Sequence, residues 1–369
     1  MTQYIWQSNS WPNFSWDNSV LLAPLSECRL KQGRLLAKIS SLGFTNEQQA
    51  QMDILLEEAV TTSAIEGEKL DRNSVRSSIA RKVGLPSAGL PADRNTDGLI
   101  DVLLDATQNH DKELTKERLW AWHAALFPTG YSGLQKIEVA RWRGEYPMKV
   151  VSGIIGREKI HYEAVPYDKV DLEMERFIQW WRNSREIDGI IRAAVAHFWF
   201  ITIHPFEDGN GRIARALTDM ALTQDDKQSM RYYSLSSQIN AERGAYYDIL
   251  ESSQKGDTDL TKWLLWFLGC FSRGIDTSEK QMSLVLEKAS FWFKHSQTQL
   301  SDRQRKVLNK LLDAGKGGFL GSLTNRKYAA ITRVSRQTAT RELQYLVDSG
   351  VIKQNKGKGR SVSYDLLWE

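Results

Sequence analysis

The sequence predicts a mainly α-helical protein with one β-hairpin and a small basic unit in its last seventy or so residues. Three observations support this prediction. Apolar residues recur at helical spacing through most of residues 46–275. The spacing changes to one typical of strands between Gly144 and Pro166. Residues 301–369 carry 14 Lys or Arg against 6 Asp or Glu, a net charge of +8; the whole chain carries +4, which leaves −4 for the rest.

Length and composition are those of a soluble globular protein. The 369 residues allow two or three domains, and 41% hydrophobic with 25% charged residues is ordinary for such chains. Two cysteines, Cys28 and Cys270, argue against a disulfide framework and for a reducing compartment. The first residues lack a signal peptide, and the densest apolar run, Trp263–Phe271, is too short to span a bilayer. We therefore expect a cytoplasmic protein without a membrane partner.

Residues 1–40 are rich in Trp and Asn, and we expect them to form an extended lead-in. Trp6, Trp11 and Trp16 are evenly spaced, and packing of their rings on a helical body is favoured over a partner-binding role. The next helices are predicted over 46–66, 73–82, 97–110 and 116–126. The Gly- and Pro-rich stretch 84–91 indicates a domain boundary or a surface crossover.

A polar, Gly-rich turn separates two strongly apolar helical segments. The first segment is predicted over 190–203 and ends before Pro205. The second begins at Gly209–Gly211, where the free N–H groups of the first turn and the positive end of the helix dipole favour a phosphate. Glycines there allow a ligand to approach the backbone closely. The turn therefore predicts an anion-binding site at the entrance of the second helix.

Four side chains of this turn suit the chemistry of a metal-bound phosphate. Arg212 and Arg215 are three residues apart, on neighbouring parts of one helix face, where both would hold phosphate oxygens. Asp208 is a hard oxygen ligand in a place that suits a phosphate-bound Mg²⁺. His204 is a candidate general base near neutral pH.

Two further segments are candidates for the borders of this site. The strand pattern over 144–166, with a turn at 156–159, predicts a hairpin, which would add a strand to an extended peptide or be purely structural. Another helix is predicted to open at Asn240 and to contain Tyr246 and Tyr247. Because adjacent helical residues point about 100° apart, one of the two tyrosines belongs to the core. A helical stretch over 259–271 then closes this core.

From His204 to Arg215 the chain resembles the Fic family, whose motif is His-x-Phe-x-(Asp/Glu)-Gly-Asn-Gly-Arg-x-x-Arg, with every fixed position present. The resemblance implies a Fic-type helical core with the hairpin as its flap. It also implies a protein adenylyltransferase that uses Mg²⁺ and moves AMP from ATP onto a Tyr, Thr or Ser hydroxyl. His204 would then be the catalytic base, Phe206 would pack beneath the turn, and Glu207 would be solvated. The residues implied to bind nucleotide are Asp208 (also the metal ligand), Gly209, Asn210, Gly211, Arg212, Arg215, Val150, Val151, Ser152, Gly153, Tyr246, Tyr247 and Gln254, the last with a solvated surface position as its alternative.

Thr62–Gly67 is similar to the inhibitory motif of one Fic branch, (Ser/Thr)-x-x-x-Glu-(Gly/Asn). The Glu66 carboxylate is predicted in the last turn of a helix that Gly67 ends, where it faces the negative end of the dipole and needs a cation nearby. The resemblance implies that Glu66 pairs with Arg215 and takes the place of the ATP γ-phosphate. Autoinhibition through Thr62, Glu66 and Gly67 is therefore expected.

The basic C-terminal unit resembles a winged helix-turn-helix. Its pattern gives helices over 302–312, 324–331 and 335–347, then strands near 351–353 and 362–364 around a basic turn, Lys356–Arg360. On the third helix the residues predicted to face a groove are Arg336, Gln337, Thr340 and Arg341, and those predicted to face inward are Ala339, Leu343 and Leu346. Such a unit would bind DNA or serve protein contacts, and the sequence leaves both open.

We therefore expect four regions. These are an N-terminal helical region with the inhibitory helix (1–95), a Fic catalytic core (96–275), a linker helix (276–300) and a winged helix domain (301–369). Two other enzyme functions use the same site, namely removal of AMP and transfer of another phosphate-containing group. A nucleotide-sensing, DNA-binding transcription regulator is the alternative from another class. The expected partners are a hydroxyl-bearing target protein, which includes the chain itself, with DNA and a homodimer left open.

Overall fold

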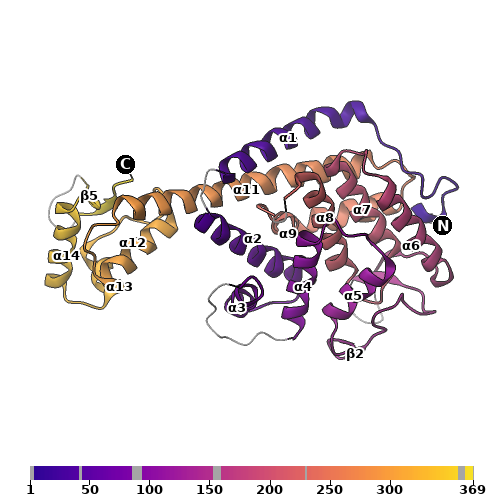
Figure 1. Ribbon diagram of the computed structural model, residues 1–369, viewed down its shortest axis with the longest axis horizontal. Coiled ribbons are helices and arrows are strands. Elements are labelled where there is room, and N and C mark those ends of the chain that lie inside the picture. The colour runs from indigo at the N-terminus through magenta and orange to yellow at the C-terminus, as the bar shows by residue number, and fades with distance from the viewer. Residues whose placement is uncertain are drawn as a thin grey trace. The chain divides into compact units, whose positions relative to one another are not determined.

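The structure is a computed structural model, and it describes residues 4–40, 44–84, 94–152, 159–228, 231–355 and 362–368. The prediction of a mainly α-helical chain is confirmed (Figure 1). The helices are η1 (Ile5–Gln7), α1 (Asn18–Ser40), α2 (Phe44–Ile65), α3 (Arg72–Lys82), α4 (Arg94–Gln108), α5 (Lys116–Leu126), α6 (Tyr167–Asn183), α7 (Gly189–Ile203), α8 (Asn210–Asp226), α9 (Leu235–Ala241), α10 (Arg243–Gln254), α11 (Thr261–Lys294), α12 (Asp302–Ala314), α13 (Asn325–Thr332) and α14 (Arg336–Asp348). The strands are β1 (Tyr131–Ser132), β2 (Gln135–Lys136), β3 (Lys149–Ser152), β4 (Lys159–Glu163), β5 (Ile352–Gln354) and β6 (Tyr364–Leu366).

The chain folds into two compact units. One contains Met1–Ser41 and Gln48–Ser278, and the other contains Leu42–Glu47 and Glu279–Glu369. The four regions expected from the sequence stay a prediction, but α11 runs unbroken through residue 275, so the expected linker helix is the second half of a longer helix. Apolar periodicity weakens after Phe271, which is why the sequence suggested two helices.

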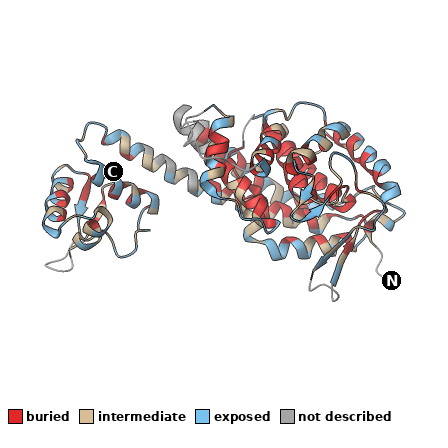
Figure 2. Ribbon diagram, turned by 90° about the horizontal axis from the view of Figure 1, so that it is seen from below, coloured by how far each residue is buried: buried red, intermediate tan, exposed pale blue. Residues whose placement is uncertain are grey.

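The core of the first unit is built around α7 and α8, which pack along each other. Every residue of α7 is buried, and Figure 2 shows buried residues concentrated on the helices of this unit. Because α7 has no polar face, neighbouring helices must cover it on all sides. Helix α6 packs on α7, while α4 and α5 pack on α8. This packing fixes the two helix ends between which the polar turn lies.

Residues 18–40 form a helix, so the predicted extended lead-in is wrong for this stretch. Asp17 caps α1, because its Oδ1 accepts hydrogen bonds from two N–H groups near the helix start, at 2.8 and 3.4 Å. Leu21 and Leu35 are buried and lie on one side of the helix. Pro24 lies inside the helix, and it concealed the helical pattern because proline interrupts helix hydrogen bonding.

The rings of the N-terminal tryptophans differ in their contacts. The Trp6 indole donates to the backbone carbonyl of Glu163 at 2.9 Å. The Trp11 indole donates to the Glu173 carboxylate at 2.8 Å and its ring lies edge-on to Trp199. Trp16 instead donates to a side chain two residues further along the chain. Two of the three rings therefore hold the N-terminal segment against the helical body.

Helix α2 ends in a tightly hydrogen-bonded turn. The N–H of Gly67 donates to Ala64 O at 3.0 Å, and the N–H of Glu68 donates to Ser63 O at 3.0 Å. Gly67 has a φ of +87°, a left-handed conformation that glycine adopts without steric cost. Together these features form a Schellman motif. The motif fixes the direction in which the Glu66 side chain leaves the end of the helix.

The predicted hairpin is present as the antiparallel pair β3 and β4. Val150 lies opposite Tyr162, Val151 lies opposite Ile160, and the register shifts by a bulge between Val150 and Val151. The Tyr162 side chain is buried, and its hydroxyl donates to the backbone carbonyl of Thr202 at 2.8 Å. The predicted turn residues 156–158 lie outside the described residues. The hairpin is therefore anchored to the end of α7 by one strand.

The second unit has its own hydrophobic core, formed by α12, α13, α14 and the pair β5 and β6. Thr324 and Ser335 cap α13 and α14 with their hydroxyl groups. Arg336, Gln337, Thr340 and Arg341 are exposed. The residues predicted to face inward are fully buried, namely Ala339, Leu343 and Leu346. The basic turn at 356–360 lies outside the described residues.

Both cysteines are buried and have free thiol groups. In the described part of the chain, no helix combines the length and the apolar character that crossing a bilayer requires.

Candidate active site

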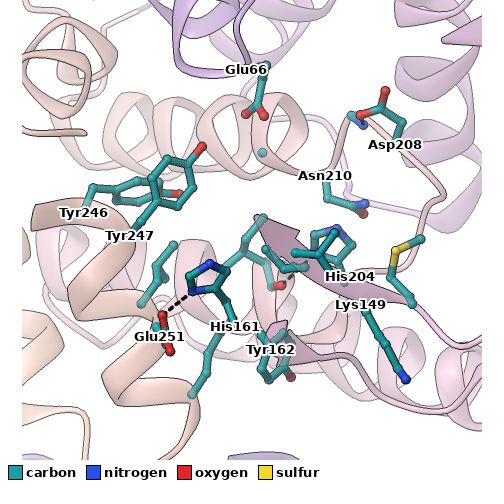
Figure 3. Close-up of a pocket in the computed structure, with 18 of the residues that line it drawn as sticks. Glu66, Lys149, His161, Tyr162, His204, Asp208, Asn210, Tyr246, Tyr247 and Glu251 are labelled. Atoms are coloured by element: carbon teal, nitrogen blue, oxygen red, sulfur yellow. Dashed lines mark hydrogen bonds and ion pairs between the residues drawn. The ribbon is translucent and has the colours of Figure 1, made fainter. Parts of the chain in front are cut away.

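A pocket of about 640 Å³ lies beside the polar turn. This volume is in the range of small-ligand sites. Its walls come from the end of α2, the hairpin, the turn after α7, the start of α8, and α10. Figure 3 shows Glu66 pointing into the pocket, with His204 and the Tyr246–Tyr247 pair on other sides.

His204 ends α7 in a left-handed conformation, with φ 54° and ψ 59°. This conformation costs a residue with a side chain roughly 1–2 kcal/mol. The Nδ1 atom lies 3.1 Å from Ile201 O. Because a carbonyl oxygen can only accept, Nδ1 carries the proton and Nε2 is left as the basic atom.

The imidazole of His204 is held in its neutral form. Burial lowers its pKa to about 4, and the positive charge of Arg143 acts in the same direction. The hydrogen bond to Ile201 and the charges of Glu66 and Asp208 act in the opposite direction without reversing the shift. A neutral imidazole at physiological pH is able to accept a proton.

Asn210 holds the polar turn together. Its Oδ1 accepts from Phe206 N at 2.9 Å, and its Nδ2 donates to Phe206 O at 2.8 Å. The Phe206 ring is buried and stacks on His123, with ring centroids 4.1 Å apart. Glu207, which we expected to be solvated, is half-buried and accepts from Glu138 N at 3.1 Å. Its contact comes from a segment about seventy residues earlier, which local sequence cannot reveal.

The entrance of α8 has the geometry expected of an anion site. Gly209 precedes the helix with φ +80°, and the first helical bond runs from Ile213 N to Gly209 O at 3.0 Å. The N–H groups of Asn210, Gly211 and Arg212 therefore precede the helical ladder. A Cβ atom added to Gly211 would lie 2.2 Å from Glu66 Oε1. The Glu66 carboxylate thus lies against the turn where a phosphate would bind.

Asp208 is a suitable ligand for a metal carried by phosphates. Its Oδ1 accepts from Gly209 N at 2.6 Å, and its Oδ2 accepts from the Ser132 hydroxyl. The described residues contain no group of three or more His, Cys, Asp or Glu that could chelate a metal alone. One carboxylate beside an anion site is what Mg²⁺ bound mainly through phosphates requires.

Arg215 is almost fully buried and is neutralised by the end of α2. Its Nη2 donates to Glu66 Oε1 at 2.7 Å and to Thr62 O at 3.0 Å, while its Nε donates to Thr62 Oγ1 at 2.6 Å. Burial alone would lower the pKa of Arg215, but the Glu66 charge raises it above its ordinary value. Glu66 is thus paired with the cation that its position at a helix C-terminus calls for.

Arg212 also has a carboxylate partner, and the sequence did not suggest it. Its Nη1 lies 3.2 and 3.4 Å from the two oxygens of Glu68, and its guanidinium lies over the Phe127 ring. Arg212 is 5% exposed, whereas the Glu68 side chain is 50% exposed. Nothing in the local sequence distinguishes Glu68 from a solvated residue, because its partner is 144 positions away.

One tyrosine of the pair is buried, as expected, and the other is exposed, while both line the pocket. Tyr246 is buried and its hydroxyl lies 2.8 Å from His197 Nε2. His197 Nδ1 contacts Thr218, whose own hydroxyl donates to Ala214 O, so Tyr246 is the donor to His197. Tyr247 is 40% exposed.

The remaining predicted contact residues are partly in the pocket. Val150, Val151 and Gln254 line it. Gln254 is buried and donates to Thr202 Oγ1 at 3.3 Å, so the alternative of a solvated surface position is wrong. Ser152 ends β3, and Gly153 lies outside the described residues.

Replacement of Tyr246 by Phe should destabilise the fold by about 1–3 kcal/mol, because His197 Nε2 would stay buried without a donor. The matched change Tyr247→Phe should stay within about 0.5 kcal/mol. Chemical denaturation of both variants measures this difference. Equal losses would contradict the assignment of Tyr246 to the core.

Comparison with known proteins agrees with this geometry. Residues 113–222 match the family described as Fic/DOC family, and residues 4–85 match one described as a domain of unknown function (DUF4172). A probable protein adenylyltransferase from Aquifex aeolicus is 34% identical over 68 residues, which is 18% of this chain and 21% of that protein. Protein adenylyltransferase Fic from Drosophila virilis is 25% identical over 158 residues, 40% of this chain and 30% of that protein. The chain thus spans less than a third of each of these relatives.

Solved structures support the fold. A Fic family protein from Desulfovibrio desulfuricans superposes with a TM-score of 0.55 at 19% identity, over 96% of this chain and 98% of that one. Fic-1 from Caenorhabditis elegans superposes with a TM-score of 0.52 at 20% identity, over 73% of this chain and 75% of that one. The chain therefore carries a domain of the Fic/DOC family, folded as in these structures.

Proposed function

We propose that this protein is an adenylyltransferase that moves AMP from ATP onto a side-chain hydroxyl of a protein and that Glu66 inhibits it. One observation carries the proposal. A neutral imidazole, a carboxylate and a helix entrance border one pocket, and two buried arginines lie in the first turns of the same helix. A carboxylate at the end of α2 lies where an anion would bind. The names of the relatives, protein adenylyltransferases, support the same reaction.

The proposed step is a displacement at the α-phosphorus of ATP. The Nε2 atom of His204 takes the proton of the acceptor hydroxyl, and the hydroxyl oxygen forms a bond to the α-phosphorus. The bond from that phosphorus to the bridging oxygen breaks, and pyrophosphate leaves. The N–H groups at the start of α8, with Arg212 and Arg215, would bind the phosphate oxygens.

Asp208 would hold Mg²⁺ together with the phosphates, since its carboxylate borders the helix entrance. A bound Mg²⁺ would offset negative charge on the phosphates.

Inhibition would follow from competition for Arg215. The Glu66 carboxylate is paired with Arg215 and borders Gly211, so a γ-phosphate cannot reach that guanidinium at the same time. ATP would then bind with its phosphates displaced from the productive position.

Two other enzyme functions would use the same residues. Glu66 would orient a water molecule for removal of AMP from a modified protein, or the site would take another phosphate-containing donor. The experiment below separates transfer from removal, because only transfer labels the protein.

The test uses ATP labelled on its α-phosphate, with Mg²⁺, and detects label on the protein itself or on added cell proteins. We expect Glu66→Gly to increase labelling about 5- to 150-fold, the range of a coupling of 1–3 kcal/mol. His204→Ala in that background should abolish it. Labelling that survives loss of His204, or an unchanged rate without Glu66, would refute the mechanism or the inhibition respectively.

Glu68 is proposed to strengthen this inhibition by occupying Arg212. In the Glu66→Gly background, Glu68→Gln should add a further gain of about two- to fivefold, because exposed ion pairs contribute up to about 1 kcal/mol. Glu57→Gln is the matched control, since Glu57 pairs with Arg72 at 2.9 Å between α2 and α3 and has no contact with an arginine of the polar turn among the described ion pairs. The Glu57 variant should label at the rate of its parent, and an equal gain in both variants would argue against a specific role of Glu68.

A second candidate function is DNA binding by the C-terminal unit, as a winged helix and as part of a regulator. The supporting observation is that Arg336, Gln337, Thr340 and Arg341 are exposed near the start of α14 while its opposite face is buried. Fluorescence anisotropy of the full chain with duplex DNA should show affinity that falls with salt. The double change Arg336→Ala and Arg341→Ala should reduce the slope of log affinity against log salt concentration by about 1 for each phosphate contact that is lost. Nonspecific contacts to phosphate are strong at a salt concentration as low as about 50 mM. An absence of binding under that condition would exclude this function.

A further inference from the structure

Arg143 is a buried cation beside the turn that carries His204. It lies between β2 and β3, and 5% of its surface is exposed. Burial lowers the pKa of its guanidinium to about 10, so the group stays charged at neutral pH. A buried charge is costly unless polar groups compensate it. Its contacts therefore require an explanation.

All hydrogen bonds of Arg143 among the described residues go to backbone carbonyls. Its Nε donates to His204 O and its backbone N–H donates to Pro205 O, both at 2.8 Å. Its Nη2 donates to Val165 O, just beyond the hairpin. The Nη1 group is buried and without a partner in the part of the chain that the structure describes. Two of the three carbonyls belong to the catalytic turn, and none of these bonds neutralises the charge.

The bonds to the turn fix an unfavourable backbone. His204 is left-handed and precedes a proline, and both features restrict its conformation. Clamping the carbonyls of His204 and Pro205 holds the peptide between them. The direction of the imidazole depends on that peptide, because Nδ1 must reach Ile201 O.

The charge of Arg143 acts on the same imidazole in the opposite direction to the charges of the carboxylates. Glu66 at the end of α2 and Asp208 in the turn favour the protonated form, whereas Arg143 favours the neutral form. The other charged or titratable residues that line the pocket, from the hairpin, the polar turn and α10, are Lys149, His161, Tyr162, Glu207, Arg243, Tyr246, Tyr247, Asp248 and Glu251. Arg143 therefore opposes the effect of the two carboxylates on the pKa of His204.

We propose that Arg143 is a positioning residue for His204. Its guanidinium bonds His204 O and its backbone N–H bonds Pro205 O, which fixes the left-handed turn, and its charge adds to burial in favouring the neutral imidazole. The inference rests on the proposed role of His204 as general base. Burying a guanidinium that has no carboxylate partner costs free energy. In this proposal the buried guanidinium serves to orient His204 and to favour its neutral form.

Titration of His204 by NMR in the full chain tests the charge directly and needs no transferase activity. Histidine labelled only at Cε1 gives one resonance per imidazole, and His204→Ala assigns the one in question. In Arg143→Met the pKa of His204 should rise from about 4 toward the ordinary value of 6.5. Arg143→Lys should leave it unchanged, because the charge is retained.

Arg192→Met is the matched control for lost packing. Arg192 is also a buried arginine whose pKa burial lowers to about 10, and it donates to Ser184, Gln224 and Trp181 O, away from the pocket. This variant should leave the His204 titration unchanged. An unmoved titration in Arg143→Met, or an equal shift in Arg192→Met, would overturn the proposal.

The rate of labelling in the Glu66→Gly background tests the positioning. The lysine in Arg143→Lys lacks the planar guanidinium that bonds the carbonyls of His204 and Val165 at the same time. We therefore expect kcat to fall by about 100-fold while the KM for ATP changes little. Arg143→Met should lose as much and should also move the acid limb of the pH–rate profile to higher pH. A kcat in Arg143→Lys equal to that of its parent would refute the positioning role. If the parent itself shows no labelling that depends on His204, the proposed function fails, and the NMR titration still decides whether Arg143 sets the charge of His204.

Discussion

The burial of Arg215 is the constraint on which the rest of this site depends. A guanidinium that is 2% exposed is strongly stabilised by an anion beside it, because an unpaired charge inside a protein costs several kcal/mol. Glu66 meets that need, and Thr62 satisfies two further donor groups. A triphosphate presents the same chemistry as the Glu66 carboxylate. The cation therefore creates one place for which a carboxylate and a phosphate compete.

The end of α2 has features that would allow the proposed competition to be reversed. Glu66 is attached to a rigid helix end by the Schellman motif at Gly67, so it reaches Arg215 without ordering a flexible loop. The same position faces the negative end of the α2 dipole, which weakens the binding of a carboxylate there. The side chain is also 29% exposed, so its charge is partly screened by solvent. The contact is specific in geometry and partly open to solvent, as the proposed release of Glu66 would require.

The sequence revealed those parts of the site that are contiguous. The turn from His204 to Arg215 contains its base, its carboxylate and its two arginines within twelve residues, so residue types and spacing were enough to predict an anion site. The starts of α13 and α14 were also predicted to within one residue, because the Thr324 and Ser335 caps act locally. Even the burial of one of the two adjacent tyrosines followed from helical geometry.

Contacts between distant segments could not be predicted in this way. Arg143 reaches His204 across 61 positions, and Glu68 reaches Arg212 across 144, and neither has a local pattern that differs from a surface residue. Helix α1 was missed for the opposite reason. Its local signals, a Trp-rich start and an internal Pro24, pointed to extended chain, while packing of Leu21 and Leu35 stabilised a helix. Tertiary burial determined the outcome wherever it conflicted with local preference.

The inhibitory contact and the catalytic base are linked through charge. Glu66 neutralises Arg215 and also favours the protonated form of His204, whereas Arg143 favours the neutral form. Departure of Glu66 from the pocket would therefore free Arg215 and would also remove a charge that raises the pKa of His204. Under the proposed function the first effect would admit a phosphate, whereas the second would leave the imidazole neutral, as burial already makes it. Under the proposed function, the end of α2 would thus act on the site chiefly by controlling the access of a phosphate to Arg215.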